Sequence, residues 1–414
     1  MSQQKKILLF LWTFLLLLFR PSFLGERFNP IIYFLFIIIT GLLFIIDPES
    51  NKRYMNKKVV FTLSLILLTV IYFLFQGLLL SNAKKTVINS CVVIFGISIC
   101  IAYVSRKDNV PHIFKSFINI FFWLSLSAII TFIIFLFCGL DESRIPLIAN
   151  LSYFFPGYVA NHLLLFPFTI VWSSVKIAGV RFLRFSGIFR EPGMTQIFLL
   201  TAYFLTYFVD VKRVKLKRFI ILIGSILTFS TGGLLSFLGG FLMLKLFGKG
   251  KIPSISIVTI TIISLTIIIV VFATIPQFGF FNKMSSESGK ERLETFNNSL
   301  KSLPEAPIFG AGYYNDFRKN NNGVVVTKKD KDVSSGLIGI ANQTGFVGLI
   351  LYIMVWFYGF SRLGNMQTLC IYMPCLLTLI FSQPSYNDVI VFFLVLTDTS
   401  NLQLISNVKK NIHE

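Results

Sequence analysis

Three arginines and one carboxylate lie within thirteen residues, Arg181–Gly193, whose sequence is RFLRFSGIFREPG. The arginines, Arg181, Arg184 and Arg190, alternate with phenylalanines, and Glu191 and a Pro-Gly turn follow directly. On either side the sequence is apolar enough to lie in lipid, where arginine is costly unless it faces a cavity, a partner charge or the head-group layer. A guanidinium binds phosphate oxygens through a planar fork. The segment therefore indicates a cationic cradle for the diphosphate of a lipid-linked sugar; the alternative is a charged membrane-edge loop without chemistry.

The composition identifies the compartment in which this segment must work. Of the 414 residues 55% are hydrophobic and 14% are charged, and the formal net charge is +20. Several apolar runs of roughly 18–22 residues are long enough to cross ~30 Å of hydrocarbon. This is the composition of a polytopic membrane protein. Its positive charge favours cytoplasmic anchoring loops and anionic membrane lipid as a partner. Nucleic acid is not expected, because no soluble basic domain exists to present a patch to it.

The cysteines argue against two other kinds of site. All five lie in apolar segments and none lies in the large polar loop, which excludes a disulfide framework. Their spacing does not match that of metal ligands, so we expect neither a metal site nor a cofactor. The first apolar run follows two lysines and lacks a small-residue cleavage site, which predicts an uncleaved first span.

Basic residues predict the orientation of the chain. Up to Lys115, nine Lys and Arg lie in one set of alternate loops and four in the other, which places the N-terminus in the cytoplasm. The next basic cluster, Lys212–Arg218, must then be cytoplasmic too, with a single span, about Gly193–Val209, before it. Asp141–Pro192 is therefore expected to be one outer loop, within which Tyr158–Val175 dips into or lies on the outer leaflet.

The second half of the chain is expected to contain a second, larger outer region. The apolar run Phe219–Phe247 is too long for one comfortable helix, and the turn signal at Ser230–Gly233 divides it into two short spans. Residues 277–345 form a long polar loop with an amphipathic helix near Gly289–Leu303, and loops of this length are usually functional. The chain is thus expected to be a single all-α membrane domain over residues 1–414. It would have about twelve transmembrane helices, both termini in the cytoplasm and two outer loops that form the site.

Four short motifs carry a resemblance to a known family. They are R-x-S-G-x-F-x-E-P-G at Arg184–Gly193, R-L-x-x-F at Arg292–Phe296, P-I-F-G-A-G at Pro307–Gly312 and Gln343–Gly348 at the start of a span. In this order, and with this topology, the chain resembles the Wzy-type polysaccharide polymerases of the O-antigen polymerase and ligase superfamily. The resemblance covers roughly Leu183 to Phe360.

The resemblance implies a metal-independent, inverting glycosyl transfer at the outer face of the bacterial inner membrane. A glycan on undecaprenyl diphosphate would be the donor, and a hydroxyl of a new lipid-linked repeat unit would attack it. Flippase and chain-length regulator proteins would be further partners. Arg184 and Arg190 match the family positions best, and Arg292 is the expected second clamp on the diphosphate, where arginines would replace a metal ion. The alternative for Arg292 is an ordinary salt bridge on a loop helix.

The general base is less clearly marked. Related ligases have a histidine in the late loop, but here the corresponding stretch, Asp332–Gly336, contains none. Two candidates are Glu191, which otherwise would be an internal partner of the arginines, and His162, which otherwise would be a hydrogen-bonded packing residue. The Gly310–Gly312 turn lacks the strand and the full fingerprint of a phosphate loop and is interpreted as a backbone turn that brings the loop close to the membrane.

Three other functions compete with a polymerase. A flippase for lipid-linked oligosaccharide would carry charged residues inside its spans and two related halves. The spans here are nearly free of charge, and polar residues gather in two outer loops, which favours chemistry at the surface. A ligase that moves finished glycan onto another acceptor would use the same site, and a passive scaffold would use none.

Overall fold

The computed structural model describes most of the chain in segments. These are residues 2–19, 22–47, 57–81, 83–138, 147–150, 163–165, 169–177, 180–189, 191–247, 306–313, 317–319, 325–327, 336–360, 368–381, 388–399 and 402.

Five helices in these segments are long and apolar enough to cross a membrane. They are Phe28–Ile46 within α2 (Phe23–Ile46), α4 (Lys57–Leu80), α5 (Lys84–Val104), α6 (Val110–Phe137) and α14 (Gly336–Phe360). The all-α, multi-pass membrane class is therefore confirmed. The figure of about twelve spans stays a prediction, because residues 251–305 lie outside the described residues.

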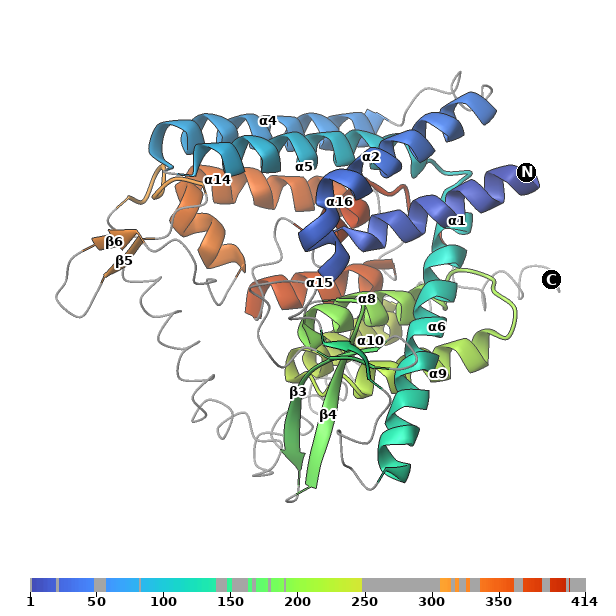
Figure 1. Ribbon diagram of the computed structural model, residues 1–414. Coiled ribbons are helices and arrows are strands. Elements are labelled where there is room, and N and C mark those ends of the chain that lie inside the picture. Colours follow the sequence, from blue (N-terminus) through green and yellow to red (C-terminus); the bar gives the residue numbers. More distant parts are fainter. Residues whose placement is uncertain are drawn as a thin grey trace.

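Shorter helices complete the helical part of the described chain. They are α1 (Gln3–Leu18), α8 (Pro192–Leu205), α9 (Val214–Ile226), α10 (Thr231–Phe247), α15 (Leu369–Phe381) and α16 (Val389–Leu396). The end of α9 and the start of α10 confirm the predicted division of the long apolar run. In Figure 1, α4, α5 and α14 lie side by side, and α15 lies with α8 and α10 in a second group that α6 and α9 flank.

A small antiparallel sheet lies in the first predicted outer loop. Strands β1 (Leu147–Asn150), β2 (Leu163–Leu165), β3 (Thr169–Ile177) and β4 (Val180–Gly187) pair in chain order. A second pair, β5 (Phe317–Lys319) with β6 (Val325–Thr327), lies in the late loop. The sequence analysis predicted none of these strands. Part of the segment expected to dip into the leaflet is β2 and β3, and its depth in the membrane stays a prediction.

The sheet is attached to α6 and to the end of α9. Leu183 and Phe185 of β4 are buried against Ala128 and Phe135 of α6 and Leu227 beyond α9. In addition, Ser127 and Thr169 share a hydrogen bond of 2.7 Å between their hydroxyl oxygens, which joins α6 to β3. Strand β4 is thereby held against the helices, and the residues that follow it continue directly into α8.

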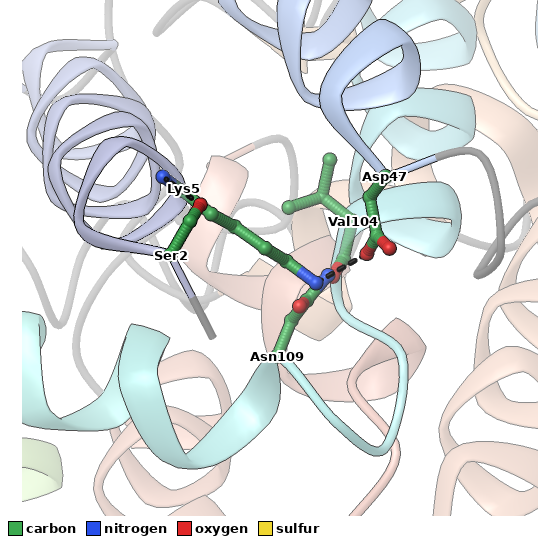
Figure 2. Close-up of polar contacts among 5 residues, drawn as sticks. All are labelled: Ser2, Lys5, Asp47, Val104 and Asn109. Atoms are coloured by element: carbon green, nitrogen blue, oxygen red, sulfur yellow. Dashed lines mark hydrogen bonds and ion pairs between the residues drawn. The ribbon is translucent and has the colours of Figure 1, made fainter.

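Several helix termini from distant parts of the chain lie together on one side of the bundle. Lys5 of α1 forms an ion pair with Asp47 at the end of α2 (Figure 2). Asn109 closes the corner between α5 and α6 by donating from Nδ2 to the last carbonyl of α5 at 3.0 Å. Beyond α16, the Asp398 N–H donates to the Ser105 carbonyl at 3.4 Å. The start of α1, the end of α2 and the residues after α16 thus lie near the corner between α5 and α6, while the number of crossings and the orientation of the chain stay predictions.

Candidate functional site

The structure describes only some of the predicted site residues. Arg184 lies in β4 and its side chain is half-buried, and Glu191 is the residue at which α8 begins. The backbone of Arg181 pairs with Lys176 in the β3–β4 ladder. The remaining candidates lie outside the described residues; they are His162, Arg190 and Arg292. A common diphosphate site for the arginines therefore stays a prediction.

The joint between α9 and α10 is where Arg184 makes contact with the helices. The last carbonyl groups of a helix have no partner within it, and in a membrane they must find one elsewhere. Here the carbonyl of Leu227 accepts from the backbone N–H of Phe185 at 3.3 Å, and the carbonyl of Thr228 accepts from Arg184 Nε at 3.3 Å. A cation at a helix C-terminus is also favoured by the helix dipole. Arg184 thus holds the connection that follows α9, a structural role that the sequence analysis did not foresee.

Phe229, at this same joint, has an uncommon backbone conformation. Its φ is +47°, in the left-handed region that residues with a side chain rarely adopt. Its ring lies 5.9 Å from that of Phe182 in β4, which helps to hold it in place. Backbone strain of this kind persists only where the surroundings enforce it, and it is concentrated at functional sites. The short, irregular connection beside Arg184 is therefore held in this conformation by the structure around it.

The motif R-x-S-G-x-F-x-E-P-G folds as a strand, a turn and the start of a helix. Gly187 turns the chain at φ +57°, and Thr195 in the first turn of α8 donates to the carbonyl of Ser186 at 2.6 Å. Phe189 is fully buried and stacks on Phe198 with ring centroids 4.4 Å apart. Glu191 precedes Pro192, which suits the first position of a helix. The corner is thereby fixed, with the carboxylate next to the positive end of α8.

Gln196 ties α8 to both halves of the joint. Its side chain is buried, and Nε2 donates to Ser225 Oγ in α9 at 3.4 Å. On the other side it lies so close to Gly233 of α10 that a Cβ atom there would overlap the amide group. A larger residue at position 233 would therefore have to displace the amide group of Gln196. The sequence analysis missed Gln196; the only signal was a polar side chain inside an apolar helix.

A second broken helix lies on the other side of the molecule. Gly345 interrupts α14 with φ +67° and ψ −172°, a combination open only to glycine. Beyond the break, Phe346 N–H donates to the Pro307 carbonyl at 2.8 Å and Val347 N–H donates to that of Ile308 at 3.4 Å. Residues 307–312, the turn P-I-F-G-A-G, thus supply partners for the second half of α14; we call them the late-loop turn.

The late-loop turn also serves the first half of α14. Ala311 N–H donates to the Asn342 carbonyl at 2.8 Å, and Gly312 N–H donates to the Gln343 carbonyl at 2.9 Å. Because these N–H groups bond to a helix end, the glycines act as a backbone turn, as predicted, and not as a phosphate loop. A Cβ atom at Gly310 would overlap the backbone of Gln343 and Gly345, which explains the need for glycine.

Two polar side chains of α4 bond to the place where the late-loop turn meets the break in α14, which is the second joint of the structure. Gln76 Nε2 donates to the carbonyls of Phe309 and Gln343, both at 2.6 Å, and its Oε1 accepts from Tyr313 N–H at 2.7 Å. Tyr72 donates from its hydroxyl to the Thr344 carbonyl at 2.7 Å. Gln76 is therefore bonded to both the late-loop turn and the broken helix. The sequence analysis missed it, because its partners lie far away in the chain.

An O-antigen ligase family model matches residues 218–353. The match begins in α9 and ends in α14, so it includes both broken-helix joints. It supports the O-antigen polymerase and ligase superfamily, and with it a multi-pass enzyme of the bacterial inner membrane that transfers glycan and handles lipid-linked oligosaccharide. It does not separate a polymerase from a ligase. A search of curated proteins found no match.

Proposed function

We propose that the protein polymerises lipid-linked oligosaccharide repeat units into surface polysaccharide at the outer face of the membrane. The bond between the anomeric carbon of the growing glycan and its undecaprenyl diphosphate breaks. A hydroxyl oxygen of the incoming lipid-linked repeat unit forms the new glycosidic bond on the opposite face, so the configuration is inverted. The hydroxyl proton passes to a base, and the lipid diphosphate leaves with the electron pair.

The observation that best supports this proposal is the position of Arg184. It lies on a strand held against α6 and the α9–α10 joint, in the motif by which the chain resembles polymerases, and Nε is anchored on the Thr228 carbonyl. Anchoring through Nε fixes the plane of the guanidinium group. A fixed cation stabilises a departing diphosphate more than a mobile one does, because no reorganisation is needed as negative charge develops.

The other candidate residues have the roles expected from the sequence. Arg181 and Arg190 would extend the cradle on the first loop, and Arg292 would close it from the late loop. Glu191 is the first candidate for the base, since α8 begins at this carboxylate and its position is fixed by the corner. His162 is the second candidate.

A ligase is the second candidate function, because the family model that matches the chain is described as O-antigen ligase. The donor and the leaving group would be the same in both reactions. The difference lies in the acceptor, which is another lipid-linked repeat unit for a polymerase and a different membrane-anchored molecule for a ligase.

Deletion of the gene, followed by sizing of the surface glycan on a gel, separates the candidates. A polymerase predicts that the ladder is lost while single repeat units remain on lipid, and that wild-type protein restores the ladder. Intact but unattached polymer would instead indicate a ligase, and loss of all surface glycan would indicate a flippase.

The outer location of the site is tested by labelling. Ser173 of β3 pairs with Arg184 in the ladder, so the two residues lie at the same level of the sheet. A Ser173→Cys variant, in a chain without its native cysteines, should react with a membrane-impermeant thiol reagent added outside. Reaction only after the cytoplasmic face is opened would contradict an outer site.

A further inference from the structure

The late-loop turn presents apolar side chains outward while its backbone bonds inward. Ile308 and Phe309 are 57% and 58% exposed, and Pro307 is exposed as well. Residues 306–313 contain no charged side chain. Two large apolar groups adjacent in a loop would be unfavourable in water, where loop surfaces are usually polar.

The position of the late-loop turn relative to the membrane-spanning helices is fixed. Gln76, which bonds to the Phe309 carbonyl, lies one helical turn before Leu80, the last residue of α4. Beside the turn, Phe346 follows the break in α14 and bonds to Pro307. The turn therefore lies level with the end of one membrane span and the broken part of another.

The two helices to which the late-loop turn is bonded carry exposed apolar side chains near the bonded residues. These side chains belong to α4 and α14; they are Phe75, Leu79, Leu80, Phe346 and Ile350. Both helices are long and apolar enough to cross the bilayer, and exposed apolar side chains on such helices are expected to face hydrocarbon. Ile308 and Phe309 are thus exposed apolar side chains on a turn that is hydrogen-bonded to both helices.

We propose that the late-loop turn is a lipid anchor, with Ile308 and Phe309 inserted among the acyl chains of the leaflet in which α4 ends. The backbone of the turn would be tolerated at this depth because the carbonyls of residues 307–309 and the N–H groups of residues 311 and 312 bond to α14 and Gln76. Such an anchor would fix the height of the late loop above the membrane. The proposal does not depend on which glycan transfer the protein performs.

Spin labels at single cysteines test this directly. The five native cysteines are replaced by Ala, and Ile308→Cys and Phe309→Cys are labelled in protein reconstituted into phosphatidylglycerol and phosphatidylethanolamine vesicles. Collision with oxygen, which concentrates in hydrocarbon, is compared with collision with a water-soluble nickel chelate. Leu79→Cys on α4 is the lipid-facing control and Lys107→Cys, in the loop between α5 and α6, is the aqueous control.

Both labels should show the oxygen-to-nickel ratio of Leu79→Cys, well above that of Lys107→Cys. A ratio equal to that of Lys107→Cys would place the late-loop turn in water and overturn the proposal. Low collision rates with both reagents would show that protein, such as a second copy of the chain, covers the turn, and would overturn it as well. The two control variants share the cysteine-free background of the test variants, so a clear difference between their ratios shows that this background is folded and inserted.

Discussion

Replacing Gly345 with Ala should weaken the joint between α14 and the late-loop turn. A residue with a side chain costs of order 1–3 kcal/mol in the backbone region that Gly345 adopts. Its Cβ atom would also overlap the Ile308 carbonyl oxygen, so the turn must move away and the hydrogen bonds to Phe346 and Val347 are lost. Two hydrogen bonds of roughly 0.5–1.5 kcal/mol each raise the total to about 2–6 kcal/mol.

The native cysteines provide the assay. Cys91, Cys370 and Cys375 are buried in the helical core, so a thiol-reactive fluorogenic dye reports their exposure as purified protein unfolds on heating. Gly41→Ala is the matched control, since Gly41 lies in α2 with open space where a Cβ atom would be placed. Alanine is a better helix former than glycine by about 0.8–1.0 kcal/mol, so this variant should melt at or above the wild-type temperature.

The expected order of melting temperatures is Gly345→Ala below wild type, and wild type at or below Gly41→Ala. Equal melting of the two glycine variants would refute the reasoning, because it would mean that the break in α14 and its contact with residue 308 do not contribute to stability. If both variants melted below wild type by the same amount, the loss would be a general effect of alanine in these helices, and the reasoning would be refuted as well.

The same melting assay and the glycan ladder test other parts of the structure. Gly233→Ala should lower the melting temperature because its methyl group overlaps Gln196, and adding Gln196→Ala should restore part of the loss; an additive further loss would contradict the contact. Arg184→Gln keeps an N–H donor at this position but removes the charge, so it should melt close to wild type yet make no ladder; a normal ladder would rule out a role in diphosphate binding. Lys5→Ala and Asp47→Ala should each destabilise the protein modestly, and the exchange Lys5→Asp with Asp47→Lys should recover stability if the pair, and not the individual residues, matters.

Hydropathy and turn signals were sufficient for the helical part of the fold. The span expected at about Gly193–Val209 agrees with α8 to within a few residues, and the apolar run Phe219–Phe247 lies within α9 and α10 and the short connection between them. The division at Ser230–Gly233 was also correct. These features depend on the length of an apolar run and on local turn residues, and both are readable in a single sequence.

The sheet was missed because its strands are as apolar as a membrane segment. Thr169–Ile177 is rich in β-branched and aromatic residues and alternates only weakly, so hydropathy alone favoured a segment in the leaflet. What makes it a strand is pairing with Val180–Gly187 and burial against α6. Antiparallel pairing depends on the turn between the strands and on a surface to cover one face, and the second condition is a tertiary one.

The residues that hold the two joints could not be predicted from the sequence, also because their contacts are tertiary. Gln76 is one polar residue in an apolar run, and its three partners are more than 230 positions away. Gly310 signalled only a turn and Gly345 only the end of the polar loop, although each is needed because the other segment approaches closely. Long-range contacts of this kind leave no periodicity and no local motif by which to recognise them.

The two joints give a physical reason why a membrane enzyme of this kind needs short and broken helices. In a continuous helix the backbone groups between the two ends bond to one another. None of them is left to bind a substrate or to hold a loop at the membrane surface. At the α9–α10 joint the open helix end recruits Arg184, and at Gly345 the break recruits the late-loop turn. Each of the two predicted outer loops is therefore attached to the helices through backbone groups that must be satisfied in any case. The position of the candidate cationic residue Arg184 is thus determined by the same hydrogen bonds that stabilise the fold.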